Sequence, residues 1–259
     1  MKNKLKIIKI GGNLIDDPDS LYKALKDFAG IRGNKILVHG GGKMATEMSA
    51  KLGFETKMSN GRRITTTQDL EVVTMVYAGL INKKIVANLQ SLNCNALGLS
   101  GADANCIVSE KRPIGEINFG FAGDIKMVNA QIIDGFLKQG LAPVFCAITH
   151  NQSGQLLNTN ADTIASTMAV AMSRHYETEL DFCFEKKGVL QNMDDSQSVI
   201  PVLDFKLYNK LVKESRVHSG MLPKLQMAFD ALKNNVSNVI IGDAGIINGT
   251  DELCTKLVL

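Results

Sequence analysis

Tryptophan is absent from this chain of 259 residues, and its aromatic residues are limited to 10 phenylalanines and 4 tyrosines. So few aromatic rings argue against a protein that binds single-stranded nucleic acid by base stacking. Charge of one sign is also scarce, because 29 basic and 26 acidic residues leave a net charge of only +3. A balance this small does not predict a nucleic-acid partner.

Long apolar runs are missing as well. None approaches the roughly 20 residues that a membrane-spanning helix requires. The basic start of the chain is followed only by Ile7 and Ile8 before Lys9 interrupts. This stretch is too short for the apolar part of a signal peptide, so we expect no membrane association.

Cysteines are few and unpatterned. Their number is odd, and they form neither a CxxC pair nor the Cys/His spacing of a metal site. The composition is ordinary for a globular protein of this size, which needs no disulfide or metal to stabilise its core. The pattern predicts reduced thiols, a cytoplasmic protein and no metal site in the chain. The five cysteines are Cys94, Cys106, Cys146, Cys183 and Cys254.

Short apolar segments alternate with longer helical patterns through most of the chain. The apolar segments are mostly continuous and rich in β-branched residues, which is typical of parallel strands covered on both faces. The alternation predicts an α/β fold, a three-layer sandwich with a mainly parallel central sheet. Strands are expected at residues 5–10, 35–39, 95–99, 143–148, 180–184 and 239–241, and helices at 21–29, 43–52, 131–139, 162–173, 204–214 and 221–234.

A further long helix is predicted over residues 67–92, where Thr66 and Asp69 have the spacing of a capping box. Residues 54–64 and 107–125 break the rhythm and are interpreted as hairpins at the edge of the sheet or over a site. None of the five prolines marks a linker, so any second lobe is expected to share one continuous sheet with the first.

Two glycine-rich turns follow predicted strands. Lys9-Ile10-Gly11-Gly12 ends the first strand, and His39-Gly40-Gly41-Gly42-Lys43 ends the second. Glycines at such a turn bring backbone N–H groups close to an anion, and the second run also opens a helix. Neither fits the P-loop or the dinucleotide-binding fingerprint, and His39 is interpreted as a packed strand-end residue.

Three further segments gather polar groups. Residues 60–65 contain Arg62 and Arg63, and arginine can bind a carboxylate in bidentate fashion. Residues 158–162 place one more short polar side chain at a helix start than capping requires. Residues 219–224 place a lysine in the first turns of a helix. Taken singly, the first segment is better explained by surface arginines in a hairpin, and the third by a helix N-terminus with an exposed lysine. The second is more specific, because its additional side chain is free to face a ligand.

Together these segments resemble the amino-acid kinase family, most closely its members that phosphorylate N-acyl-glutamates. They occur in the family's order and span nearly the whole chain. The resemblance implies the amino-acid kinase fold, whose three layers agree with the fold predicted from periodicity. The matching pieces are residues 9–12, 39–42, 60–65, 98–103, 123–124, 157–162 and 219–224.

The resemblance also implies an activity in arginine biosynthesis: transfer of the γ-phosphoryl group of ATP to the side-chain carboxylate of an N-acyl-L-glutamate. It places Lys9 and Lys224 on either side of the moving phosphoryl group, where charge must be stabilised. Asp162 would hold both lysines, since a carboxylate nucleophile has no proton for a base to remove. Mg²⁺ would arrive with ATP, held by phosphates and water.

Binding residues follow from the same resemblance. Backbone N–H groups would donate to phosphate at the first glycine turn, and Arg63 would bind the α-carboxylate of the acyl-glutamate. The implied acyl-glutamate site consists of Gly41, Gly42, Arg63 and Asn158, and the implied nucleotide site of Gly11, Gly12, Glu185 and Gly188.

One segment departs from the family pattern. Relatives usually show an Asp-Val-x-Gly turn after the fifth strand, whereas residues 184–189 read Phe-Glu-Lys-Lys-Gly-Val. Gly188 keeps the turn, but Glu185 and two lysines replace the usual residues. The C-terminal residues 242–259 are also fewer than is typical, and both changes concern the nucleotide lobe.

We expect a single domain of two lobes, with residues 1–174 binding the acyl-glutamate and residues 175–259 binding the nucleotide. Only four residues precede the first predicted strand, whereas arginine-inhibited relatives carry an extra N-terminal helix that joins dimers into a hexamer. The resemblance therefore predicts a homodimer that arginine inhibits poorly, with the 67–92 helix as its candidate interface.

Three questions stay open at this point. The chain can be another kinase of this fold, acting on aspartate, free glutamate, an aminoadipate derivative or carbamate. It can also be a catalytically silent homologue that binds amino acids. The acyl group can be acetyl or succinyl, and Arg62, Lys57 and Lys43 are candidates to pair with a succinyl carboxylate.

Overall fold

The computed structural model describes residues 2–59, 61–192, 194–214, 221–249 and 253–259. Asn60 of one predicted motif and Ser219 and Gly220 of another lie outside these ranges. Within the described residues, no helix is both long enough and apolar enough to span a membrane.

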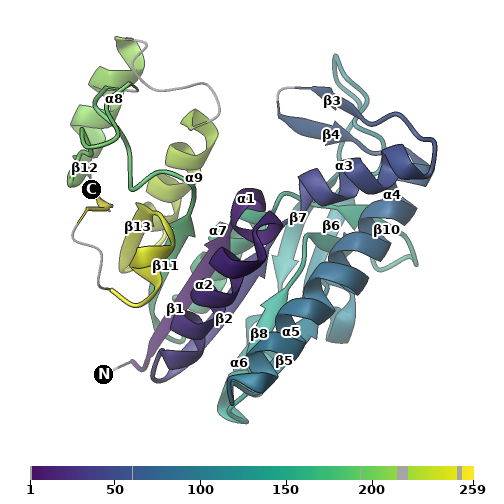
Figure 1. Cartoon of the computed structure of the whole chain (residues 1–259), viewed down its shortest axis with the longest axis horizontal. Coiled ribbons are helices and arrows are strands. Elements are labelled where there is room, and N and C mark those ends of the chain that lie inside the picture. The colour runs from purple at the N-terminus through teal and green to yellow at the C-terminus, as the bar shows by residue number, and fades with distance from the viewer. Residues whose placement is uncertain (1, 60, 193, 215–220, 250–252) are drawn as a thin grey trace.

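The centre of the molecule is an eight-stranded sheet in the order β12-β14-β13-β11-β1-β2-β8-β5 (Figure 1). Its neighbouring strands run parallel except for β13 and β14. β1 and β2 lie in the middle with almost every residue buried, as their continuous apolar sequences predict. The strands are β1 (Lys4–Ile10), β2 (Asn34–His39), β5 (Ala96–Leu99), β8 (Ala142–Phe145), β11 (Glu177–Cys183), β12 (Val202–Asp204), β13 (Asn238–Gly242) and β14 (Thr255–Val258).

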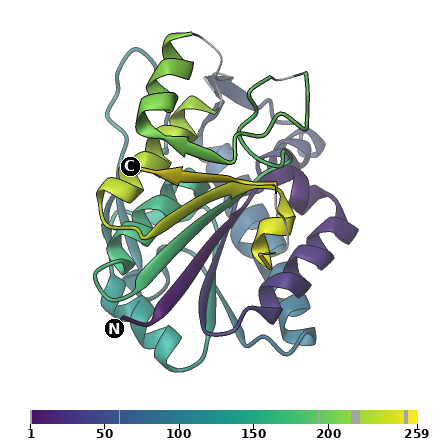
Figure 2. The same ribbon diagram turned by 90° about the vertical axis from the view of Figure 1, so that its left-hand side faces the viewer.

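Helices cover both faces of this sheet. On one face α2 (Pro18–Gly30) packs against α5 (Asn82–Ser91), and on the other α7 (Ala161–Met172) packs between α6 (Ala130–Lys138) and α9 (Leu222–Lys233). Figure 2 shows the two helical layers on either side of the strands. The predicted three-layer sandwich with a mainly parallel sheet is confirmed. The boundary between the two lobes stays a prediction, although strands from both sides of residue 174 share the sheet.

The two predicted hairpins are present. β3 (Lys57–Ser59) pairs antiparallel with β4 (Arg62–Ile64), and β6 (Ile107–Lys111) pairs antiparallel with β7 (Gly123–Val128). β6 and β7 belong to a second, four-stranded sheet that also contains β9 (Ile148–His150) and β10 (Leu156–Asn158).

The prediction of one strand over residues 143–148 was wrong, because the chain leaves the central sheet at Cys146. The Cys146 N–H still donates to Leu99 of that sheet, but the carbonyl of Ala147 accepts from Thr159. These bonds turn the chain from β8 into β9 of the second sheet.

The long helix begins as predicted but is not uniform. Thr66 and Asp69 form a capping box at the start of α4 (Thr67–Val73). The next segment, η1 (Thr74–Ile81), is a π-helix that continues into α5. Periodicity does not distinguish the two helix types over eight residues. The short helix α1 (Gly12–Asp16) was also missed, because Gly11-Gly12 was interpreted as a tight turn.

Four elements remain, of which α3 frames the cavity. α3 (Gly42–Lys51) opens directly from the glycine turn after β2, and α8 (Phe205–Lys213) follows β12. The 3-10 segments are η2 (Asp103–Asn105) and η3 (Ala244–Ile247).

Candidate active site

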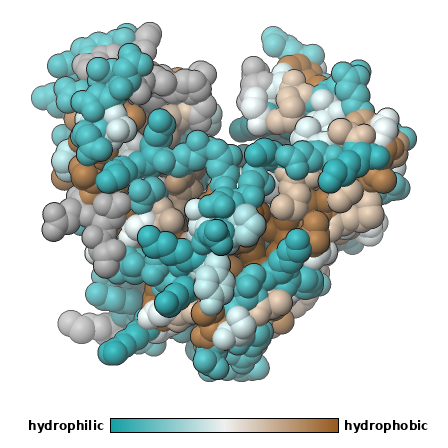
Figure 3. All heavy atoms as spheres, in the orientation of Figure 1, coloured by the Kyte–Doolittle hydropathy of each residue, from teal (hydrophilic) through white to brown (hydrophobic). Residues whose placement is uncertain are grey.

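A cavity of about 430 Å³ lies at the carboxyl ends of β1 and β2. This is the edge of a parallel sheet at which α/β proteins bind ligands. Figure 3 shows the molecule hollowed along its upper edge, between the α8–α9 side and the β3–β4 hairpin. Seven of the sequence-predicted site residues line the cavity: Lys9, Gly12, Gly41, Gly42, Arg63, Asn158 and Asp162.

Lys9, Asp162 and Lys224 come together from three elements. Lys9 lies near the end of β1 with only 7% of its surface exposed, and its Nζ is 2.7 Å from Asp162 Oδ1. Lys224, in the first turn of α9, places its Nζ 3.5 Å from Asp162 Oδ2. One carboxylate at the start of α7 therefore holds two ammonium groups, of which that of Lys9 lines the cavity.

The charges of this triad depend on one another. Burial alone would raise the pKa of Asp162, but the ammonium groups of Lys9 and Lys224 hold that pKa below its usual value. Burial lowers the pKa of Lys224, and the positive charge of Lys9 acts in the same direction against the attraction of Asp162. The triad is therefore a carboxylate between two cations, of which Lys224 loses its proton more easily than an ordinary lysine.

An aromatic ring covers both lysines. The centroid of Phe184 is 3.8 Å from Lys224 Nζ and 5.2 Å from Lys9 Nζ. Its ring also stacks on Phe182 of β11, with centroids 6.1 Å apart. Phe184 belongs to the segment that departs from the family pattern, and sequence analysis gave it no role because cation–π contacts leave no spacing signal.

The first glycine turn opens toward the lysines. Gly11 precedes α1, and a Cβ added to it would lie 3.4 Å from the Cys183 carbonyl oxygen and 3.7 Å from Lys9 Nζ. A Cβ added to Gly12 would meet nothing within 4 Å. The protein's own packing therefore does not require glycine at either position, and the open space beside Gly12 is available to a ligand.

The second glycine turn is packed much more tightly. Gly41 has a φ of +150°, and an added Cβ would overlap the Ile81 side chain. Only glycine fits here, because both the backbone conformation and the contact exclude a side chain. Gly42 then begins α3, so the first N–H groups of this helix face the cavity.

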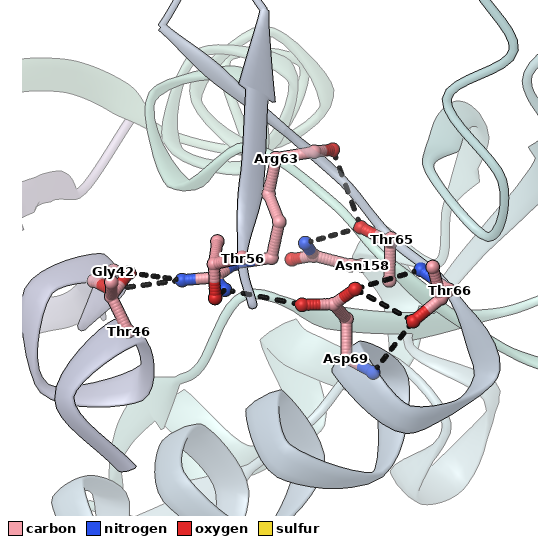
Figure 4. Close-up of polar contacts among 8 residues, drawn as sticks. All are labelled: Gly42, Thr46, Thr56, Arg63, Thr65, Thr66, Asp69 and Asn158. Atoms are coloured by element: carbon pink, nitrogen blue, oxygen red, sulfur yellow. Dashed lines mark hydrogen bonds and ion pairs between the residues drawn. The ribbon is translucent and has the colours of Figure 1, made fainter. Parts of the chain in front are cut away.

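Arg63 is buried in the cavity wall and is already hydrogen-bonded (Figure 4). Its Nη1 donates to Thr56 and Asp69, and its Nη2 donates to the Gly42 carbonyl and Thr46. These bonds use all four hydrogens of the two terminal nitrogens. The fork expected to grip a substrate carboxylate therefore ties β4 to α3 and α4.

Asn158 lines the cavity at the end of β10. Its Nδ2 donates to Thr65 Oγ1 over 3.0 Å, and Thr65 in turn donates weakly to the Arg63 carbonyl (Figure 4). The Oδ1 atom of Asn158 is not used in this bond and remains available to accept from a ligand.

Three of the four predicted nucleotide residues, Gly11, Glu185 and Gly188, do not line the cavity, and neither does Lys224. Glu185 is exposed and accepts a hydrogen bond from Asn13. Gly188 is buried, and an added Cβ there would approach Thr255 Oγ1 to 2.6 Å and Val199 to 2.7 Å. Gly188 thus allows its loop to pack closely on β14, and a direct role of either residue in nucleotide binding stays a prediction.

Several residues that line the cavity were not predicted from the sequence, and Tyr77 and Arg112 are the largest polar side chains among them. Tyr77 projects from η1, and Arg112 follows β6 and binds Asp124 through both Nε and Nη2. With these included, the described lining carries cationic side chains against one carboxylate, a balance suited to an anionic ligand. The cations are Lys9, Lys43, Arg62, Arg63 and Arg112, and the carboxylate is Asp162.

Comparison with known proteins identifies the family. The profile of the amino acid kinase family matches residues 4–243. The chain belongs to the amino acid kinase family. The acetylglutamate kinase of Cytophaga hutchinsonii is 51% identical over 260 residues, covering 98% of each chain. That of Parabacteroides distasonis is 50% identical over 245 residues, covering 95% of this chain and 96% of the relative.

Among solved structures, the carbamate kinase of Giardia lamblia bound to AMP-PNP superposes with a TM-score of 0.67. It is 14% identical, and the match covers 99% of this chain and 98% of the other. A likeness at this identity supports the amino acid kinase fold alone. Members of the family with different substrates share the fold, so it does not select the substrate.

Proposed function

We propose that the protein transfers the γ-phosphoryl group of ATP to the side-chain carboxylate of an N-acyl-L-glutamate, as the acetylglutamate kinases do. The observation that carries this proposal is the triad of Lys9, Asp162 and Lys224 beside two glycine turns. Two cations held by one carboxylate suit a reaction whose transition state spreads negative charge over a moving phosphoryl group.

The proposed step needs no proton transfer. A carboxylate oxygen of the acceptor forms a bond to the γ-phosphorus, while the bond from that phosphorus to the β–γ bridging oxygen breaks and ADP leaves. Lys9 and Lys224 stabilise the transferring oxygens from two sides. Asp162 positions both lysines and stays ionised, since its pKa is held below the usual value.

The acceptor is proposed to lie against the second glycine turn. Backbone N–H groups of Gly41 and Gly42 donate to its reacting carboxylate, and Asn158 Oδ1 accepts from its amide N–H. Arg63 supplies positive charge to the α-carboxylate from within the wall. Because its terminal nitrogens are already bonded, it acts mainly by fixing α3 and the hairpin around the substrate.

The nucleotide is proposed to enter between the first glycine turn and α9, with Gly11, Gly12, Glu185 and Gly188 beside it. No group of three His, Cys, Asp or Glu side chains able to hold a metal ion occurs in the described parts of the chain. Mg²⁺ is proposed to arrive with ATP, held by the phosphates and water, where it would neutralise phosphate charge.

A homodimer is proposed through the long helix. Met75 of η1 is 55% exposed and Leu80 is 36% exposed, while Val76, Tyr77 and Ile81 of the same helix are buried against the core. Figure 3 shows apolar atoms gathered on the side of α5. Light scattering tests this: we expect twice the mass of the 28.1 kDa chain. A Met75→Glu, Leu80→Glu variant is expected to be monomeric, and a monomeric wild type would contradict the interface.

The proposed activity is tested by trapping the acyl phosphate with hydroxylamine in the presence of ATP and Mg²⁺. We expect hydroxamate with an N-acyl-glutamate and background with aspartate, free glutamate, aminoadipate derivatives and carbamate. A stronger signal with one of these acids would favour another kinase of the fold, and no turnover with any acid would favour the silent homologue.

The acyl group is resolved by the same assay. Comparing kcat/KM for N-acetyl-L-glutamate and N-succinyl-L-glutamate separates the two substrates. If succinyl is preferred, neutralising Arg62, Lys57 and Lys43 in turn identifies the cation that pairs with the additional carboxylate.

A further inference from the structure

His39 is fully buried behind the second glycine turn and does not line the cavity. Its Nδ1 lies 2.9 Å from the carbonyl oxygen of Gly40, and its Nε2 lies 3.1 Å from Nδ2 of Asn82. Asn82 is the first residue of α5 and is also buried. A side chain of the central sheet is thus bonded at one end to the turn and at the other to the long helix.

The partners of Asn82 determine which way its amide lies. Its Nδ2 is 2.9 Å from the Val144 carbonyl, which can only accept, and its Oδ1 is 3.2 Å from Lys83 Nζ, which can only donate. The second hydrogen on Nδ2 is then directed at His39 Nε2. Nε2 must accept, and the imidazole proton must reside on Nδ1.

With the proton on Nδ1, His39 donates to the Gly40 carbonyl. A trans peptide is planar, and its C=O and N–H point in opposite directions. Holding the Gly40 oxygen against the buried imidazole therefore aims the Gly41 N–H away from the core, toward the cavity that Gly41 lines. Burial lowers the pKa of His39 to about 4, and the nearby positive charge of Lys83 acts in the same direction, so the ring stays neutral near pH 7.

We propose that His39 and Asn82 are positioning residues that aim the Gly41 N–H at the acceptor carboxylate. This inference rests on the proposed function, because it assigns the hydrogen bond to the acyl-glutamate. His39 is therefore more than the packed strand-end residue that its sequence position suggests.

The π-helix supplies an independent reason for the arrangement. In η1 the i→i+5 hydrogen bonds bring residues five apart onto one face, as Tyr77 and Asn82 are. Tyr77 and Ile81 pack against Gly41, while Asn82 reaches His39 just behind it. The helix thus directs Tyr77 and Ile81 at Gly41, and Asn82 at the histidine that precedes the turn.

Gly98 of β5 leaves space for the side-chain amide of Asn82. A Cβ added to Gly98 would overlap Asn82 Oδ1 and lie 2.9 Å from Lys83 Nζ, and Lys83 also donates to the Gly98 carbonyl. A side chain at this position would displace Asn82 and free the imidazole to take either tautomer.

A matched pair of variants tests the proposal. In His39→Asn the amide nitrogen can occupy the place of Nδ1 and donate to Gly40, whereas in His39→Gln it occupies the place of Nε2. We expect His39→Asn to keep the KM for the acyl-glutamate within about threefold, and His39→Gln to raise it about tenfold, the equivalent of one hydrogen bond. The KM for ATP should change less than about twofold in both.

Equal effects of the two variants, or an equal rise in both KM values, would overturn the proposal. Should either variant fail to fold, the wild type decides. The chain has 4 histidines, so ¹⁵N spectra of the imidazoles can be assigned. We expect His39 protonated at Nδ1 alone between pH 6 and about 8. The Nε2–H tautomer would overturn the assignment, whether or not the enzyme phosphorylates an acyl-glutamate.

Discussion

The two sides of the candidate site are built differently. On the proposed acceptor side, the turn after β2 and the hairpin β3–β4 are fixed by buried hydrogen bonds, through Arg63 on one flank and His39 on the other. On the proposed nucleotide side, the described residues include an exposed Glu185, an aromatic ring and the ammonium group of Lys224.

This difference has a physical meaning. A preformed network of hydrogen bonds selects the shape of a small acceptor, because misplaced polar groups would leave buried partners unsatisfied. Point charges act over distance and tolerate movement, which suits a phosphoryl group in transit. Substitutions on the acceptor side are therefore expected to change substrate binding, and those at the lysines to change the rate of transfer.

The largest effect is expected from the lysines. Lys9→Ala or Lys224→Ala removes a charge that matters most in the transition state, so kcat should fall roughly 10²–10⁴-fold. Steady-state kinetics at saturating substrates measures this, with Lys23→Ala, an exposed lysine of α2, as the control. A change confined to KM would contradict the assigned roles.

The second largest effect is expected from Asp162→Asn. The two ammonium groups lose their counter-ion, so kcat is expected to fall about tenfold or more. Asp162 raises the pKa of Lys224, and its loss therefore lowers that pKa further. Because the proposed mechanism requires Lys224 to be protonated, the alkaline limb of the kcat–pH profile should move to lower pH. An unmoved limb would show that Asp162 does not act through Lys224.

Arg63→Lys probes the acceptor side. Lysine keeps the charge but cannot replace four hydrogen bonds, so the KM for the acyl-glutamate should rise roughly tenfold while that for ATP changes little. A drop of several degrees in Tm should accompany it, because three elements lose their tie. Arg32→Lys, at an exposed arginine outside the cavity lining, is the control, and equal changes in both KM values would indicate a purely structural role.

The smallest effect is expected at Phe184. A cation–π contact contributes about 0.5–2 kcal/mol, so Phe184→Leu should lower kcat by about threefold or somewhat more. Phe184→Tyr keeps the ring over both lysines and should restore the rate. If the kcat of Phe184→Leu equals that of the wild type, the ring contributes packing alone and does not stabilise the lysine charges.

The sequence predicted the fold well for a physical reason. Continuous apolar strands such as β1 and β2 can only be buried between two layers of helices, and that pattern is local. Capping by Thr66 and Asp69 is local too, and it was found. The glycine runs after β1 and β2 are visible in the local sequence, whereas Lys9 and Asp162 were assigned to a site by the resemblance to the family, and their roles stay a prediction.

The features that the sequence did not predict depend on contacts between segments that are distant in the chain. Asp69 was found as a cap, but its bond to Arg63 requires the hairpin to fold back onto α4. The bond from Asn82 to His39 joins residues 43 positions apart, and the π-helix that permits it has the same apolar pattern as an α-helix. Such pairings are set by packing, and one sequence does not display them.

The most direct test of the central claim is the single-turnover rate of phosphoryl transfer from ATP to saturating N-acetyl-L-glutamate. It should be measured for the wild type, Lys9→Ala, Lys224→Ala and the double variant, each with native circular dichroism. The account predicts rapid transfer in the wild type, and at least about a hundredfold slower transfer in each lysine variant. Absence of ATP-dependent transfer in the wild type, or an undiminished rate in the folded double variant, would contradict it.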